Sequence, residues 1–369
     1  MNNQNRAWLL AVALGAVVLL AGCERPPPKS VQQGYRGTGM VAVTNPRTDA
    51  MLQANNVMPP ALPPAEGEAP LAKDVYKNVQ VLTDLNVTEF VRQMTNQAAW
   101  VAPTEQCAYC HNLNDFASDE KYTKVVARRM LQMTRDININ WQKHILQTGV
   151  TCYTCHRGKP VPQYVWFDNP GPRKAPGEAG WRDGQNIGAM SVGLTAMPYD
   201  PFNTFLVQDG VVKIQSLTPL PSGDPMNIKQ TESSYALMMH MSQALGVNCT
   251  HCHATQNFGQ WNNAPPQRVQ AWFAIRMVRM ANNKYMLPLA SVLPANRKGP
   301  LGDGPKIYCT TCHQGQPKPL NGVSMMAIAP ELMRIKPPPA PPADAAPAAE
   351  APAATTAAAP ASGPTGGAM

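Results

Sequence analysis

Apolar side chains recur every three to four residues in four stretches of the chain, and this spacing predicts four amphipathic helices. In the first stretch, Asn86 and Glu89 have the spacing of a capping box, which marks a helix start. The helices are expected from Asn86, after Ser118, from about Thr231 to a stop at Gly246, and after Pro265 and Pro266. A short hairpin is expected around residues 205–214. The pattern therefore predicts a mainly α fold with minor β structure and long irregular connectors.

An apolar run near the start of the chain is typical of an export signal. Arg6 precedes the run from Ala7 to Ala21, which is shorter than the roughly 20 residues that a membrane-spanning helix needs. The run ends in Leu-Ala-Gly-Cys23 and resembles a bacterial lipobox, so residues 1–22 are predicted to be a signal peptide and Cys23 to carry a diacylglycerol. A short transmembrane anchor is the alternative, and both interpretations place the remainder outside the cytoplasm. Two acyl chains are enough for stable membrane attachment.

Short repeats indicate two related halves in the middle of the chain. Ala127-Arg-Arg-Met-Leu-Gln-Met133 resembles Ala274-Ile-Arg-Met-Val-Arg-Met280, and Gly149-Val-Thr-Cys resembles Gly246-Val-Asn-Cys. We expect two pseudo-symmetric halves, each built from two units of a helix followed by a Cys-x-x-Cys-His motif. The expected order is a signal peptide 1–22, a lipid-anchored extended segment 23–74, a first half 75–165, a connector 166–230, a second half 231–330 and a disordered Ala/Pro-rich tail 331–369.

The Cys-x-x-Cys-His motif occurs four times and is the signature of c-type haem attachment. Two thioether bonds hold the porphyrin, and the adjacent histidine binds the iron. A zinc site or a dithiol redox pair is the alternative for a single copy, but four copies in an exported chain favour four covalently bound haems c. The ninth cysteine is Cys23, so no thiol remains for a disulfide framework. The motifs comprise Cys107, Cys110 and His111; Cys152, Cys155 and His156; Cys249, Cys252 and His253; and Cys309, Cys312 and His313.

The sixth ligand of each iron separates an electron carrier from an enzyme, because catalysis on small molecules needs an exchangeable iron position. Only three of the seven histidines lie outside the motifs, which excludes four bis-histidine haems. We assign Met94, Met130 and Met238, which lie on apolar helix faces, to the first three haems. A helical methionine is often core filler, and Met133 and Met239 are close rivals of Met130 and Met238. The remaining histidines are His144, His240 and His251, of which the last two are expected at surface or packing positions.

The formal net charge of +8 would suit nucleic acid or an anionic membrane, but the propionates of four haems explain the excess of Lys and Arg more simply. No nucleic-acid partner is expected. Charge is uneven along the chain, because residues 84–120 hold six acidic residues against Arg92 alone. The opposite sign gathers on the fourth helix, at Arg268, Arg276 and Arg279. An acidic end near the first haem would steer a basic donor protein, and ordinary solvated surface is the alternative.

The motifs, their grouping into two pairs and the helices before them resemble the tetrahaem cytochrome subunit of the photosynthetic reaction centre of purple bacteria, over about residues 75–320. The lipobox, Tyr235-Ala-Leu-Met-Met and Gly246-Val-Asn-Cys-Thr add to the resemblance. In that family three haems have one histidine and one methionine ligand, and one haem has two histidines. The resemblance implies the pairs Met94 and His111, Met130 and His156, Met238 and His253, and His144 and His313.

The same resemblance implies an electron carrier rather than an enzyme. It implies a lipid-anchored subunit on the periplasmic face of the inner membrane, bound to the reaction-centre core subunits that carry the bacteriochlorophyll special pair. A soluble periplasmic donor, either a small cytochrome c or a high-potential iron-sulfur protein, would reduce one end, and four haems would pass electrons to the photo-oxidised special pair. An exported multihaem reductase of a small nitrogen or sulfur compound is the alternative, and it would need a five-coordinate iron. A quinol-oxidising cytochrome would need more histidines and a spanning helix.

Overall fold

The structure is a computed structural model that describes residues 26–33, 38, 40–169, 188–213 and 228–333. The expected signal peptide, Cys23 and residues 334–369 of the Ala/Pro-rich tail lie outside these residues. The disorder predicted from residue 331 is wrong for residues 331–333, because Glu331 and Leu332 are buried in a 3-10 turn. Within them the fold is mainly helical, as the sequence predicts, and strands form a single two-stranded sheet. No helix in the described part is both long enough and apolar enough to cross a bilayer.

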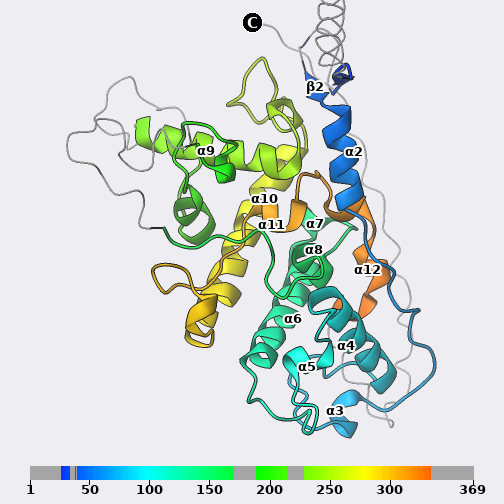
Figure 1. The fold of residues 1–369 in the computed structure, drawn as a ribbon. Coiled ribbons are helices and arrows are strands. Elements are labelled where there is room, and N and C mark those ends of the chain that lie inside the picture. Colours follow the sequence, from blue (N-terminus) through cyan, green and yellow to red (C-terminus); the bar gives the residue numbers. More distant parts are fainter. Residues whose placement is uncertain (1–25, 34–37, 39, 170–187, 214–227, 334–369) are drawn as a thin grey trace, which may run out of the picture. The chain divides into compact units, whose positions relative to one another are not determined.

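Four long helices occupy the four predicted stretches (Figure 1). Helix α4 begins at the predicted cap, because Asn86 Oδ1 accepts a hydrogen bond from Glu89 N at 2.9 Å and Glu89 Oε2 accepts one from Asn86 N at 3.0 Å. Helix α6 begins later than predicted, since Ser118 Oγ only caps a turn by accepting from Glu120 N. The four helices are α4 (Val87–Val101), α6 (Tyr122–Asn140), α9 (Ile228–Leu245) and α10 (Gln267–Ala281).

Each Cys-x-x-Cys-His motif begins a short helical turn. These turns are α5 (Cys107–Cys110), α8 (Cys152–His156), η4 (Cys249–His251) and α11 (Cys309–His313). The other short α-helices are α2 (Pro46–Asn55), α3 (Ala72–Val75), α7 (Gln142–Ile145) and α12 (Met325–Ile328). The 3-10 turns are η2 (Met190–Val192), η6 (Leu287–Ser291), η7 (Ala295–Arg297), η8 (Pro319–Gly322) and η9 (Pro330–Leu332), and the π-helical turns are η3 (Asn203–Val207) and η5 (Asn282–Met286).

The hairpin predicted around residues 205–214 is wrong as far as residue 213, where the described part stops. The chain there forms the π-helical turn η3 and then an irregular stretch. Phe205 and Leu206 are 2% and 0% exposed, so two successive side chains are buried. Successive strand residues point to opposite faces, and a hairpin with one solvated face would expose one of this pair. Burial on both sides therefore favours the helical turn.

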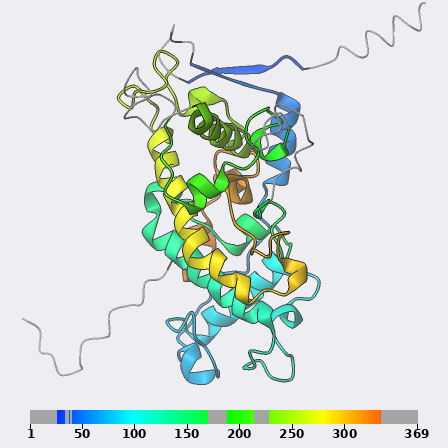
Figure 2. The same ribbon diagram turned by 90° about the vertical axis from the view of Figure 1, so that its left-hand side faces the viewer.

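Helices α6 and α10 run side by side and contact each other (Figure 2). The larger hydrophobic cluster forms where these helices meet α9 and η3, and it includes Ile137, Leu237, Ile275, Val278 and Phe205. A smaller cluster around Trp100 and Leu131 joins α4 to α6. The two clusters flank the motif turns, so the hydrophobic core positions the candidate sites.

The segment expected to be extended contains a hairpin and a ten-residue helix. Strands β1 (Lys29–Gln32) and β2 (Val41–Thr44) pair antiparallel, and α2 follows. We call the described part of residues 26–63 the N-terminal strap. It is held by hydrogen bonds from distant residues: Asn248 Nδ2 to Val41 O at 2.9 Å, Asn56 Nδ2 to Gln314 O at 3.2 Å, and Arg92 Nη2 to Leu62 O at 2.7 Å. The strap therefore contacts the third motif, the fourth motif and α4 in turn.

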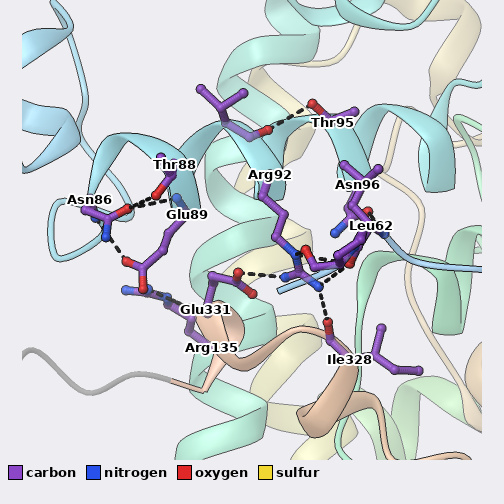
Figure 3. Close-up of polar contacts among 12 residues, drawn as sticks. Leu62, Asn86, Thr88, Glu89, Arg92, Thr95, Asn96, Arg135, Ile328 and Glu331 are labelled. Carbon is purple, nitrogen blue, oxygen red and sulfur yellow. Dashed lines mark hydrogen bonds and ion pairs between the residues drawn. The ribbon is translucent and has the colours of Figure 1, made fainter. Parts of the chain in front are cut away.

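The end of the strap and the end of the described chain meet at a buried ion pair (Figure 3). Arg92 Nη1 lies 2.6 Å from Glu331 Oε1, and the two side chains are 6% and 3% exposed. The same guanidinium donates to the carbonyls of Leu62, Pro63 and Ile328. Burying a charge is costly unless it is paired and hydrogen-bonded. The Arg92 guanidinium meets both conditions, whereas Glu331 is paired through Oε1 but its Oε2 is buried without a hydrogen-bond partner among the described residues.

Candidate haem sites

The four motif histidines share one hydrogen-bond arrangement. In each, Nδ1 lies within hydrogen-bond distance of a backbone carbonyl oxygen that follows the motif. A carbonyl can only accept, so Nδ1 carries the proton and the lone pair of Nε2 is left for a metal. The contacts are His111 to Phe116 O at 3.2 Å, His156 to Lys159 O at 2.9 Å, His253 to Phe258 O at 2.9 Å and His313 to Gln316 O at 2.9 Å.

The arrangement comes in two forms that alternate along the chain. At the first and third sites the carbonyl belongs to a phenylalanine five residues on, whose ring packs on the histidine with centroids 5.1 and 5.2 Å apart. At the second and fourth sites the carbonyl lies three residues on, and a left-handed residue follows the histidine, Arg157 with φ 50° and Gln314 with φ 48°. This alternation agrees with the repeat that pairs residues 127–133 with 274–280, before the second and fourth motifs, but not with the repeat at Gly149 and Gly246, which pairs the second motif with the third.

The first and second sites share one cavity of about 910 Å³. Its volume falls within the roughly 300–1,000 Å³ of typical cofactor and ligand pockets, and its wall is mostly apolar, as such pockets are. Residues from both motifs and both predicted methionines line it: Met94, Cys107, Cys110, His111, Met130, Cys152, Cys155 and His156. The rival Met133 lines it too. The side chains present therefore suit large apolar groups attached through the paired cysteines.

The loop after the first motif is fixed by two lysines of the α6 start that sequence reasoning overlooked. Lys124 is buried, and its Nζ donates to the carbonyls of Phe116, Ala117 and Ser118 at 2.8 to 2.9 Å. Lys121 Nζ donates to Ala108 O inside the motif. Because Phe116 O also accepts from His111, Lys124 orients the histidine indirectly. The spacing of these lysines in the first turn of α6 was the available signal.

At the fourth site the structure brings His144 and His313 together, although 169 positions separate them. Their ring centroids lie 6.0 Å apart. A bond from a metal ion to an imidazole nitrogen is about 2 Å long. Two imidazoles that bind one metal ion from opposite sides therefore have ring centroids about 6 Å apart, which fits this pair. His144 Nδ1 is held by Gln270 O of α10 at 3.2 Å. Burial lowers the pKa of His144 to about 4, which keeps the neutral, metal-binding form.

At the third site Met238 and Met239 point to different neighbours. Met238 packs against the larger hydrophobic cluster, whereas the Met239 methyl group reaches toward Gly193. Tyr235, one turn before Met238, is exposed, as are Val269 and Trp272 on α10. These exposed apolar side chains lie on the two helices that flank the third motif in sequence.

The motifs also lie close to one another in a definite order. The Sγ atoms of Cys155 and Cys312 are 3.1 Å apart, so the second and fourth sites adjoin. The end of α9 meets the fourth motif, where Gly315 N donates to Ala244 O at 2.8 Å. A Cβ on Gly246 would lie 2.2 Å from Gly315 O, so this approach requires glycine. The third motif follows Gly246 directly, which places the third site beside the fourth.

His240 is a packing residue, one of the two roles expected for it. It is 1% exposed, its Nδ1 lies 2.7 Å from Ser191 O, and its ring stacks on Tyr308 with centroids 4.6 Å apart. Its Nε2 is buried without a hydrogen-bond partner in the described part of the chain. Burial lowers the pKa of His240 to about 4. His251 is half-buried in η4, and burial lowers its pKa.

The acidic stretch before residue 120 carries less free charge than its composition indicates. Asp84 is buried against Arg135 at 2.6 Å, Glu89 caps α4, and Asp119 pairs with Arg128 at 2.9 Å. The Arg128 hydrogen bond holds the pKa of Asp119 well below its usual range. The exposed carboxylates of this stretch without an ion pair among the described residues are Glu105, Asp115 and Glu120, and the apolar side chains Leu113 and Phe116, which are close to Asp115 in the sequence, are exposed as well.

Paired cysteines beside histidines with a free Nε2, set around an apolar cavity, define a c-type cytochrome. Residues 24–333 match the family model of the photosynthetic reaction centre cytochrome c subunit. The chain is 53% identical over 336 residues to the photosynthetic reaction center cytochrome c subunit of Rubrivivax gelatinosus, which covers 91% of each chain. It is 46% identical to that of Thermochromatium tepidum over 90% of this chain and 82% of the relative, and 39% identical to that of Roseobacter denitrificans over 89% and 92%. The chain therefore belongs to the family of photosynthetic reaction centre cytochrome c subunits, whose role is electron transfer.

Proposed function

We propose that the chain carries four haems c and relays electrons from a soluble periplasmic donor to the photo-oxidised bacteriochlorophyll special pair of a reaction centre. The eight motif cysteines would hold the haems, and each motif histidine would bind one iron through Nε2. The single observation that carries the proposal is the Nδ1-to-carbonyl contact repeated at all four histidines, because it fixes the tautomer and orientation of an axial ligand.

The second ligands follow from what faces each site. Met94 and Met130 line the shared cavity, and Met238 lies on α9, which ends just before the third motif. His144 faces His313, and both rings are oriented by carbonyls through Nδ1. With both faces of every iron bound by this chain, the sites suit charge transfer and leave no position for a substrate. The alternative role as a reductase of small nitrogen or sulfur compounds is not favoured by the family.

The type of the second iron ligand influences the reduction potential of each haem. A haem with histidine and methionine ligands has a higher reduction potential than a haem with two histidines. His144 therefore gives the fourth haem a lower potential than its methionine-bound neighbours. The chain supplies position, ligands and dielectric, whereas the haem supplies the one-electron chemistry when bound.

The two ends of the row of sites differ in charge. Glu105, Asp115 and Glu120 are exposed on either side of the first motif in the sequence, as are the apolar Leu113 and Phe116 that follow it, and these side chains suit a donor protein with basic residues around an apolar patch. Near the third motif, Arg268 stacks on Trp261 at 4.2 Å and Arg276 on Trp272 at 3.2 Å. Arginine and tryptophan are enriched in interfaces, so this end suits contact with the reaction-centre core.

The lipid anchor agrees with that orientation. Five residues lie between Cys23 and the start of β1 at Lys29, a span of at most about 20 Å. Strand β2 is bonded to the third motif through Asn248 and Thr250, which both donate to Val41 O. A diacylglycerol on Cys23 would hold the third site close to the periplasmic face of the inner membrane.

Haem counting and flash spectroscopy test the proposal. The pyridine haemochrome spectrum of the purified chain should give four haems c per polypeptide, and the reduced protein should not bind carbon monoxide. In membranes, a flash should oxidise haem of this subunit as the special pair is re-reduced. Fewer than four haems, or an iron that takes up carbon monoxide or nitrite, would overturn the proposal that this chain binds four haems and supplies both ligands of every iron.

A further inference from the structure

Arg157 lies at the junction of the second and fourth sites. It follows His156 directly, in the left-handed conformation that ends α8. Its Nε donates to Thr154 O at 3.2 Å, within the second motif, and its Nη2 lies 3.4 Å from Cys312 O, within the fourth. The side chain therefore contacts the backbone of both motifs at the point where Cys155 and Cys312 meet.

The guanidinium is only partly satisfied. Nη2 also donates to Asn56 Oδ1 of the N-terminal strap at 3.0 Å, whereas Nη1 is buried without a hydrogen-bond partner. No carboxylate of the described residues forms an ion pair with it. Arginine stays protonated in proteins, so a full positive charge persists at this junction, on a half-buried side chain that is bonded to the strap.

The position is occupied differently in the two related motifs. Gln314 stands after His313 in the same left-handed conformation, with φ 48° against 50° for Arg157. The backbone therefore accepts an uncharged residue here. The charge, rather than the turn geometry, distinguishes Arg157 from its counterpart.

We propose that Arg157 is a shared electrostatic element that raises the reduction potentials of the second and fourth haems together. The inference rests on the proposed function, since it needs a haem at both motifs. Reduction removes one positive charge from an iron, so a nearby fixed cation favours the reduced form. One cation between two sites acts on both, which brings the bis-histidine haem closer in potential to the methionine-bound third haem, whose motif Arg157 does not contact. The potential difference between the second and fourth haems stays the same.

The test is a redox titration of the full holoprotein carrying Arg157→Gln, with electron paramagnetic resonance identifying the bis-histidine haem. Two of the four potentials should fall, one of them that of the bis-histidine haem, and the other two should stay unchanged. Arg157→Lys keeps the charge and should keep both potentials close to those of the wild type. Lys318→Gln is the matched control, because it removes an exposed charge from the segment that follows the fourth motif, where solvent screens it.

The outcomes separate cleanly. A pyridine haemochrome count below four in the wild type defeats the proposed function itself. With four haems present, unchanged potentials in Arg157→Gln, an equal shift of all four, or a shift of one haem alone would overturn the shared role. Equal shifts in Arg157→Lys and Arg157→Gln would assign the effect to packing, and an equal shift in Lys318→Gln to general surface charge. Either result would also overturn it.

Discussion

The Sγ atoms of Cys155 and Cys312 lie 3.1 Å apart, which joins the second motif of the chain to the fourth rather than to the third. The first and second sites share a cavity, and Gly246 and Gly315 bring the start of the third motif against the end of the fourth. The spatial order of the sites is therefore first, second, fourth and third. Sequence order and spatial order differ because the two halves meet through their second motifs.

This order places the site with two histidines inside the row. An electron entering at the first site crosses from one half to the other between the second and fourth sites, beside Arg157. The proposed lower potential of the fourth haem is then an internal step, flanked by methionine-bound haems on both sides. Because neighbouring sites adjoin, an electron can pass over the lower-potential fourth haem without a separate carrier between the sites.

Replacing His144 by methionine should raise one haem potential. The substitution turns the proposed bis-histidine iron into a histidine–methionine iron, and thioether ligation favours the reduced state. Redox titration should show one potential rising while three stay unchanged, and electron paramagnetic resonance should lose its bis-histidine signal. His240→Gln is the matched control, because His240 is equally buried but faces Phe202 and Tyr308. A bis-histidine signal that survives in His144→Met and disappears in His240→Gln would reverse the assignment.

Met130 and Met133 should respond differently to replacement by leucine, although both line the cavity. In Met130→Leu one iron loses its second ligand, so the reduced protein should bind one carbon monoxide per chain, as seen in the Soret spectrum. In Met133→Leu no carbon monoxide should bind, and the free energy of unfolding should fall by less than about 1.5 kcal/mol, as for other volume-conserving changes. Carbon monoxide binding by the Met133 variant alone would make Met133 the ligand.

Three of the four long helices were predictable because a start or stop signal stands beside an apolar stripe in the sequence, whereas the start of α6 has no capping side chain. The Asn86 and Glu89 cap, the Gly246 stop and the Pro265-Pro266 start all stand in the sequence next to an apolar stripe, and α4, α9 and α10 follow them. The hairpin prediction failed because alternation over a few residues resembles a buried helical turn, and only tertiary burial of Phe205 and Leu206 separates the two.

The candidate sites were predictable only in part. The motifs identify one face of each haem site, because cysteine attachment and histidine ligation are encoded within five residues. The placement of His144 opposite His313 depends on α7 packing against α10. No local sequence pattern encodes a contact between residues that are 169 positions apart. The roles of Lys124 and Arg157 are also tertiary, since each acts on backbone carbonyls of another segment.

Charge reversal at Asp115 and Glu120 should slow the donor. Both carboxylates are exposed beside the first motif, and long-range attraction raises association rates at low salt. The double variant Asp115→Lys and Glu120→Lys should reduce the second-order rate of haem reduction by about 10-fold or more and flatten its salt dependence, as measured by flash kinetics. Asp119→Asn is the control, because Asp119 is already neutralised by Arg128 and Lys124. Unchanged reduction rates in the double variant would contradict the proposal that the donor binds at this surface.

Removing one partner of the Arg92 and Glu331 pair should destabilise the protein strongly. Arg92→Met leaves the Glu331 carboxylate buried without its cation and leaves the carbonyls of Leu62, Pro63 and Ile328 without their donor. A loss of about 3–5 kcal/mol in the free energy of unfolding is expected for a broken buried ion pair. The denaturation midpoint, followed by circular dichroism, measures the loss, and hydrogen exchange should rise at residues 61–63 of the N-terminal strap.

The double variant Arg92→Met and Glu331→Leu distinguishes the cost of an unpaired charge from the value of the pair. Two apolar side chains of similar size remove both charges, so the double variant should be more stable than Arg92→Met alone, although three backbone carbonyls still lack a donor. The double-mutant cycle should therefore give a coupling energy well above the roughly 0.5 kcal/mol found for independent sites. Additive losses would show that Arg92 acts only through its backbone carbonyl contacts. In that case Arg92→Lys, which keeps the charge but lacks the planar fork, should be as unstable as Arg92→Met.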